Sequence, residues 1–119
     1  MPIRVFHCDD SEPFTRLVSH WLSEHDDIEH VGAAHTTDDA LAKLPQASPD
    51  VVLLDTMGDP GDETLLREVR AAAPSAKVIV YSGYVGLLQE GGLGGSADAY
   101  LDKDDHEAAL VEAIRAVMA

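Results

Sequence analysis

Three short apolar runs, rich in β-branched residues, constrain the fold of this chain most strongly. They lie at residues 3–8, 51–54 and 78–81. Runs of this length without polar alternation indicate strands that are buried on both faces, as in parallel sheets covered by helices. Segments of helical period separate them, and five strand and helix units can be counted along the chain. The sequence therefore predicts an α/β domain built on a parallel sheet.

The segment after the first run has a clear helical start. Ser11 stands at the N-cap position and Pro13 in the first turn, so we expect a helix that runs to about His25. Its apolar face is expected to lie in the core. The residues of that face are Phe14, Leu17, Val18, Trp21 and Leu22.

The remaining elements follow from caps and breakers. A strand is expected near residues 29–34, and then a helix that is capped within residues 36–39 and stops before Pro45. The third helix is expected to end at Pro74, and the last to be capped by Asp104 or Asp105. The apolar residues of these helices are Ala40, Leu41 and Leu44, then Leu65, Leu66 and Val69, then Leu110, Ala113, Ile114 and Val117.

The segment of residues 85–95 is a poor helix. Three apolar residues, Val85, Leu87 and Leu88, run into the stretch Gly91-Gly92-Leu93-Gly94-Gly95. Each glycine destabilises a helix by about 1 kcal/mol relative to alanine. The sequence therefore predicts a fourth helix that is short or mobile.

Length, charge and cysteine content limit the class of protein. The 119 residues are enough for one domain, expected over residues 1–119. The 22 acidic and 8 basic side chains give a net charge of -14, which repels phosphodiester backbones and disfavours direct binding of DNA or RNA. The single cysteine, Cys8, is expected to be a small buried apolar residue rather than part of a disulfide. With neither a leader peptide nor a long apolar run, we expect a cytoplasmic protein without membrane contact.

Acidic and polar residues stand where the predicted strands end. Asp9 and Asp10 follow the first run, Asp55 the second and Ser82 the third, and Lys103 comes later in the chain. The carboxyl ends of parallel strands meet at one edge of a sheet, so these side chains should gather there. Three neighbouring carboxylates are unfavourable without a cation, and Mg²⁺ prefers such oxygen ligands. Lys103 and Ser82 would bind a phosphate, with Asp55 as the nucleophile that forms an aspartyl phosphate.

In this order and at these spacings, the motifs resemble the receiver domains of bacterial two-component response regulators, from about residue 3 to residue 117. The resemblance implies a flavodoxin-like (CheY-like) fold with strand order 2-1-3-4-5 and helices on both faces of the sheet. The motifs that carry it are Asp9-Asp10, Val51-Val52-Leu53-Leu54-Asp55, Val78-Ile79-Val80-Tyr81-Ser82-Gly83 and Ala97-Asp98-Ala99-Tyr100-Leu101-Asp102-Lys103.

The resemblance also implies a role for individual residues. Tyr100 would turn inward as Ser82 moves toward the phosphate, and this would repack the face formed by the fourth helix, the fifth strand and the fifth helix. The other implied roles are phosphoryl acceptor for Asp55, direct Mg²⁺ ligand for Asp10, water-mediated ligand for Asp9, backbone-carbonyl ligand for Met57, and phosphoryl binding for Ser82 and Lys103.

The implied partner is a sensor histidine kinase or a phosphotransfer protein that donates the phosphoryl group. The chain would not be a turnover enzyme, although slow self-dephosphorylation is expected, with Tyr84 affecting water access. Lys103-Asp104, in place of lysine-proline, and residues 30–34 resemble the subgroup with a LuxR-type (NarL/FixJ-like) helix-turn-helix output, which implies transcription regulation. The sequence leaves open a stand-alone receiver or a longer regulator with a DNA-binding output domain, and also homodimer formation.

Two other classes of function are to be weighed. Gly58-Asp59 replaces the usual Met-Pro after the acceptor, which allows a phosphorylation-independent interaction module. A phosphatase of the haloacid dehalogenase type would need a second aspartate at the position of Met57. A histidine metal site is disfavoured because no pair among the 6 histidines has the helical i,i+4 spacing, so they are interpreted as ordinary surface or strand residues.

Overall fold

A five-stranded parallel sheet forms the centre of the molecule. The computed structural model describes residues 2–55, 63–82, 97–103 and 106–119. The strand order is β2-β1-β3-β4-β5, and each neighbouring pair is parallel, so the predicted order and direction are confirmed. The strands are β1 (Ile3–Cys8), β2 (Ile28–Ala34), β3 (Val51–Leu54), β4 (Lys77–Ser82) and β5 (Ala99–Asp102).

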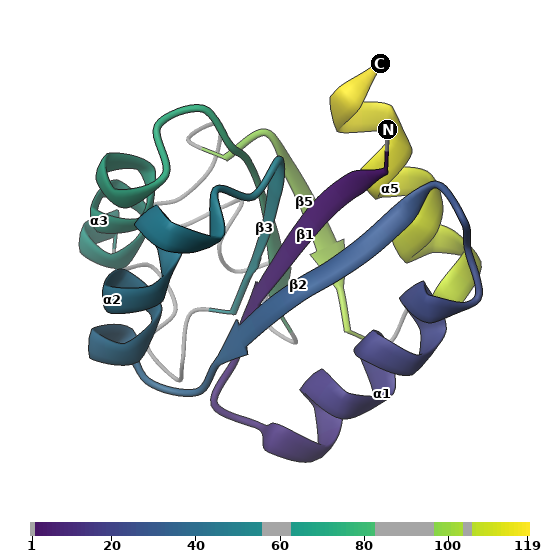
Figure 1. Ribbon diagram of the computed structural model, residues 1–119, viewed down its shortest axis with the longest axis horizontal. Helices are drawn as coiled ribbons and strands as arrows, with labels where there is room; N and C mark the ends of the chain where they lie inside the picture. The colour runs from purple at the N-terminus through teal and green to yellow at the C-terminus, as the bar shows by residue number, and fades with distance from the viewer. Residues whose placement is uncertain (1, 56–62, 83–96, 104–105) are drawn as a thin grey trace.

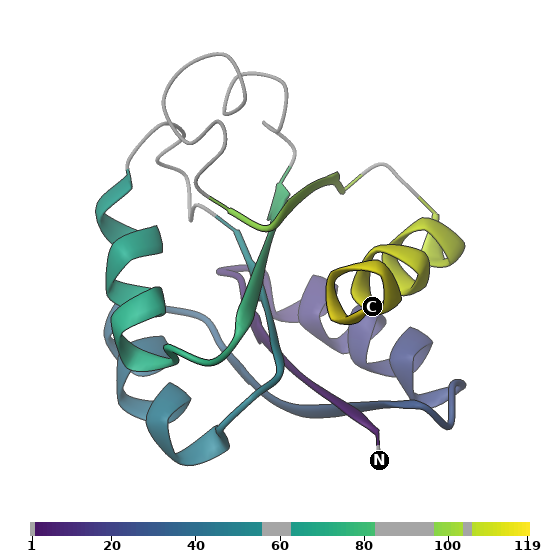
Figure 2. The ribbon, with the colours of Figure 1, turned by 90° about the horizontal axis from the view of Figure 1, so that it is seen from above.

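Helices cover both faces of this sheet, as predicted. Figures 1 and 2 show α1 (Glu12–Ser23) and α5 (Glu107–Met118) on one face, and α2 (Thr37–Ala47) and α3 (Glu63–Ala72) on the other. The expected fourth helix and its glycine cluster lie outside the described residues. Covering both faces explains why the strands read as continuous apolar runs.

The starts of α1 and α2 follow the predicted capping residues. The Ser11 hydroxyl accepts a hydrogen bond from the Phe14 amide at 3.3 Å, and Pro13 lies in the first turn. The Thr36 hydroxyl accepts from the Asp39 amide at 3.1 Å. Each bond satisfies one of the amides that a helix leaves without an internal partner at its amino end.

Two predicted boundaries are wrong. The helix α2 does not stop before Pro45 but includes it and ends at Ala47. Proline removes only one amide donor this close to the end, and Ser48, with φ of 45°, closes the helix with a 3.2 Å bond from its amide to the Leu44 carbonyl. The N-cap of α5 is His106 rather than Asp104 or Asp105, and its side chain makes no capping hydrogen bond.

The buried side chains form two groups, one on each face of the sheet. The group against α2 and α3 includes Phe6, Leu44 and Val69. The group against α1 and α5 includes Val5 and Ile114. Because successive strand residues point to opposite faces, neighbours along β1 supply both groups.

The predicted core holds apart from a few helix positions. Leu17 is 43% exposed, because it falls outside the arc of α1 that carries the buried Thr15, Val18 and Leu22. In α5, Leu110 and Ile114 are buried as expected, and Val111 is buried as well. The other two predicted residues, Ala113 and Val117, are only partly buried.

Gly32 is a point of close contact between β1 and β2. A methyl group at its Cα would lie 2.9 Å from Cε2 and 3.1 Å from Cδ2 of Phe6, whose side chain is only 1% exposed. We therefore expect Gly32→Ala to lower the free energy of unfolding by about 1–3 kcal/mol through overpacking, measured by urea denaturation. In a Phe6→Leu background the loss should shrink, and an equal loss there would show that the ring is not the obstacle.

Candidate functional site

The three predicted aspartates meet at the carboxyl edge of the sheet. Asp9 follows β1 and is fully buried, Asp10 next to it is exposed, and Asp55 follows β3 and is 6% exposed. Backbone bonds fix this edge, since the Asp9 amide donates to Ala34 at 3.0 Å and the Asp55 amide to Cys8 at 2.8 Å. One carboxylate oxygen from each aspartate lies within 4.8 Å of the others, so the structure brings the predicted acidic cluster together.

Asp9 contacts three polar groups. Its Oδ1 accepts a hydrogen bond from the Ser11 amide at 2.8 Å. Its Oδ2 lies 2.8 Å from Lys103 Nζ and 3.5 Å from His7 Nε2. Burial raises the pKa of Asp9, but its contacts with His7, Lys103 and the Ser11 amide outweigh the burial and bring the pKa to about 2. Asp9 is therefore a carboxylate at neutral pH.

Lys103 joins two of the carboxylates. Its Nζ lies 2.8 Å from Asp9 Oδ2 and 3.6 Å from Asp55 Oδ2, and the side chain is 24% exposed. Burial lowers the pKa of Lys103, but the hydrogen bond to Asp9 and the charges of Asp55 and Asp9 outweigh it, so that the pKa is raised. The side chain is thus a fixed ammonium beside the predicted acceptor.

The donor set suits a hard divalent cation. Three carboxylates face one ammonium, which leaves two formal negative charges uncompensated at the edge of the sheet. All three aspartates offer oxygen, the ligand type of Mg²⁺, and Asp10 is exposed to solvent where an ion would enter. Within the described residues, this is the one group of three acidic, histidine or cysteine side chains close enough to share an ion, so no histidine cluster is found there.

The other predicted site residues are placed less completely. Ser82 is the last residue of β4 and pairs with Asp102 of β5. Tyr100 is half-buried, packs against the group of buried side chains under α2 and α3, and its hydroxyl accepts a bond from the Ala97 amide at 3.4 Å. The residues Met57, Gly58, Asp59, Tyr84 and Asp104 lie outside the described residues.

Two residues lie at this site although the sequence analysis did not predict them there. His7, interpreted as an ordinary strand histidine, is fully buried and its Nε2 lies beside Asp9. Phe14, interpreted as a core residue only, has its ring 4.9 Å from Lys103 Nζ. The role of His7 could have been predicted from the alternation of side chains along β1, because this alternation places His7 and Asp9 on the same face of the sheet. No sequence signal linked Phe14 with Lys103, which follows it by most of the chain.

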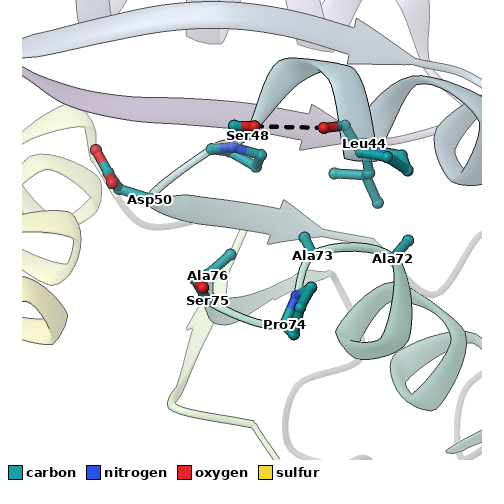
Figure 3. A pocket seen from close by; sticks show the side chains of 10 residues that line it. Leu44, Ser48, Asp50, Ala72, Ala73, Pro74, Ser75 and Ala76 are labelled. Atoms are coloured by element: carbon teal, nitrogen blue, oxygen red, sulfur yellow. Dashed lines mark hydrogen bonds between the residues drawn. The ribbon is translucent and has the colours of Figure 1, made fainter.

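A separate pocket lies at the opposite, amino edge of the sheet. It has a volume of about 220 Å³ and is lined by the ends of α2 and α3 and the residues that precede β3 and β4 (Figure 3). Its carboxylate, Asp50, already accepts a 2.9 Å bond from the Arg4 amide. The pocket lacks the convergent charges of the acidic edge, so the latter is the stronger candidate site.

No helix among the described residues is long and apolar enough to cross a membrane.

Comparison with known proteins agrees with this geometry. Residues 5–115 match the response regulator receiver domain family. The response regulator protein VraR of Staphylococcus saprophyticus is 32% identical over 117 residues, which cover 97% of this chain and 56% of that protein. A protein-glutamate methylesterase/protein-glutamine glutaminase of Trichodesmium erythraeum is 38% identical over 80 residues, which cover 66% of this chain and only 23% of that protein. The chain thus spans little more than half the length of the first of these relatives.

Solved structures share the fold. The response regulator domain of Thermotoga maritima CheB superposes with a TM-score of 0.79 at 24% identity, over 99% of this chain and 97% of that one. The receiver domain of the putative NarL of Mycobacterium tuberculosis gives 0.73 at 25% identity, over 96% and 97% of the two chains. A LuxR family DNA-binding response regulator of Staphylococcus aureus gives 0.79 at 24% identity, over 97% and 98%. The chain belongs to the response regulator receiver domain family of two-component signalling.

Proposed function

We propose that Asp55 accepts a phosphoryl group and thereby controls the binding surface of this receiver. The main support is the position of Asp55. One of its carboxylate oxygens lies within 4.8 Å of an oxygen from each of Asp9 and Asp10, and its Oδ2 lies 3.6 Å from Lys103 Nζ. A carboxylate nucleophile, a ligand set for a divalent cation and a fixed ammonium are the parts that phosphoryl transfer needs.

The donor in this proposal is a phosphohistidine of a sensor kinase or phosphotransfer protein. An oxygen of Asp55 attacks phosphorus, the phosphorus–nitrogen bond breaks, and the leaving nitrogen takes the electron pair. The product is an aspartyl phosphate, which water later hydrolyses to the carboxylate and inorganic phosphate. The chain acts on itself alone and is not a turnover enzyme.

Asp10 would bind Mg²⁺ directly, Asp9 through water and Met57 through its backbone carbonyl, together with Asp55. Bound Mg²⁺ neutralises charge on the transferring phosphoryl group. Asp9 keeps its place through the Ser11 amide, at 2.8 Å. Lys103, whose Nζ already lies 3.6 Å from Asp55 Oδ2, would pair with a phosphoryl oxygen, and the Ser82 hydroxyl would bind another.

Phosphorylation would change the position of Tyr100. Its half-buried ring would move inward as Ser82 moves toward the phosphate. This would change the surface around β5 and α5. The VraR relative is nearly twice as long as the matched region, and a LuxR-family DNA-binding response regulator shares the fold. In this proposal the receiver therefore controls transcription in the cytoplasm through a DNA-binding domain. The receiver itself carries a charge of -14 and would not bind DNA.

Intact-mass spectrometry after incubation with acetyl phosphate and Mg²⁺ tests the proposal. One phosphoryl adduct is expected on the parent chain, and none with Asp55→Asn or when EDTA removes the metal. Asp38→Asn, an exposed change on α2, is the matched control and should keep the adduct. No adduct from acetyl phosphate or from a phosphorylated histidine kinase would overturn the proposal in favour of a phosphorylation-independent interaction module.

A further inference from the structure

Lys103 has an aromatic neighbour besides its two carboxylates. Its Nζ lies over the ring of Phe14, 4.9 Å from the ring centroid. Phe14 belongs to the first turn of α1, whereas Lys103 follows β5. The contact therefore joins two elements that are distant in the sequence, directly beside the acidic cluster.

The ring of Phe14 is itself held in a fixed orientation. His7 meets it edge-on, with ring centroids 5.8 Å apart and planes inclined by 71°. Tyr81 meets it at 5.3 Å and 49°. Both neighbours have fully buried side chains, on β1 and β4, so Phe14 rests on two rigid strands.

The face of an aromatic ring carries partial negative charge and attracts an ammonium within about 6 Å, more strongly where water is excluded. Lys103 is only 24% exposed, so this attraction acts in a partly desolvated place. The ammonium thus has three anchors, namely Asp9 Oδ2 at 2.8 Å, Asp55 Oδ2 at 3.6 Å and the Phe14 ring. With the two carboxylates alone, the Lys103 ammonium could still rotate about the line that joins Asp9 Oδ2 and Asp55 Oδ2. The Phe14 ring limits this rotation.

We infer that Phe14 is a positioning residue for phosphoryl transfer, whose ring face holds the Lys103 ammonium between Asp9 and Asp55. The inference rests on the proposed function, because it assigns Phe14 a part in the same reaction. A purely structural Phe14 would fill space between α1 and the sheet, and leucine would replace it at little loss of reactivity. A positioning Phe14 cannot be replaced in this way, since leucine has no ring face.

Phosphorylation kinetics separate the two roles. At saturating Mg²⁺, we expect Phe14→Leu to lower the rate of phosphorylation by acetyl phosphate about 2- to 5-fold, the size of a partly exposed cation–π contact. Phe14→Tyr keeps the ring and should restore most of the rate. Trp21→Leu is the matched control, because it removes another half-buried ring from the same helix, and should react like the parent. A Phe14→Leu rate equal to that of the parent would overturn the inference.

A double-mutant cycle shows whether Phe14 acts through Lys103. In a Lys103→Met background, Phe14→Leu should produce no further loss of rate, because the ammonium that the ring holds is gone. The same fold loss in both backgrounds would assign Phe14 a merely structural effect and would overturn the inference. A parent chain that takes up no phosphoryl group would instead contradict the proposed function.

A spectroscopic test needs no phosphoryl chemistry. The ring current of Phe14 should move the NMR resonances of the Lys103 ε-methylene protons upfield, with the signal assigned by its disappearance in Lys103→Met. Phe14→Leu should return this resonance to the position of a solvated lysine, and Trp21→Leu should leave it in place. An ε-methylene resonance that does not respond to Phe14→Leu would refute the contact and with it the inference.

Discussion

Replacing Lys103 by methionine should destabilise the metal-free chain by about 2–3 kcal/mol, because the buried Asp9 carboxylate then loses the cation 2.8 Å from its Oδ2. Methionine keeps the length and the apolar character of the lysine stem, so the loss reports on charge. Urea unfolding in EDTA measures the effect as a shift of the midpoint at constant slope.

Saturating Mg²⁺ should narrow this difference, since a divalent ion supplies the positive charge that the variant lacks. The increase in unfolding free energy on adding Mg²⁺ should thus be larger for Lys103→Met than for the parent. Lys43→Met is the matched control, because Lys43 pairs with Asp39 on the exposed surface of α2. Equal gains from Mg²⁺ in the two proteins would contradict the view that Lys103 and the metal neutralise the same carboxylates.

Acid should remove about 2 kcal/mol of stability through Asp9 alone. Its pKa is lowered from 3.8 to about 2 in the folded chain, so the unfolded chain binds the proton more readily. A carboxyl group with a lowered folded pKa stabilises the fold above its ordinary pKa. That contribution is lost as the pH falls from 3.8 through about 2. Urea unfolding in EDTA over this range measures it.

Other acidic residues also titrate in this range, so the comparison with Asp9→Asn isolates the contribution of Asp9. At pH 5 the parent should exceed the variant by the full contribution of Asp9, and the gap should shrink by about 2 kcal/mol toward pH 2. A gap that stays constant over this range would mean that the carboxylate does not gain stability from His7, Lys103 and the Ser11 amide.

The fold could be predicted largely because its signals are local. The buried strands read as apolar runs, and Ser11 and Thr36 start helices by bonds that span three residues. The acidic edge followed from one geometric rule, that parallel strands end at the same side of a sheet. Asp9, Asp55 and Lys103 therefore lie together, as this rule predicts.

The wrong predictions concern positions where a rule based on local sequence does not decide the structure by itself. Pro45 follows enough of α2 for the helix to continue past it, and Leu17 falls outside the buried arc of α1, where solvent reaches it. The contact of Phe14 with Lys103 depends on how α1 sits on the sheet relative to the end of β5. Hydrophobic period identifies the buried face of a helix but not the particular side chain across from it.

The separation of the buried side chains into two groups has a consequence for redesign. Val5 and Phe6 are neighbours in β1 but belong to different groups, and among the described residues the two groups have no member in common. We therefore expect substitutions of described residues on opposite faces to have nearly additive effects on the free energy of unfolding. The layer of α2 and α3 can therefore be repacked as an independent module, with the layer that carries Phe14 left in its native composition.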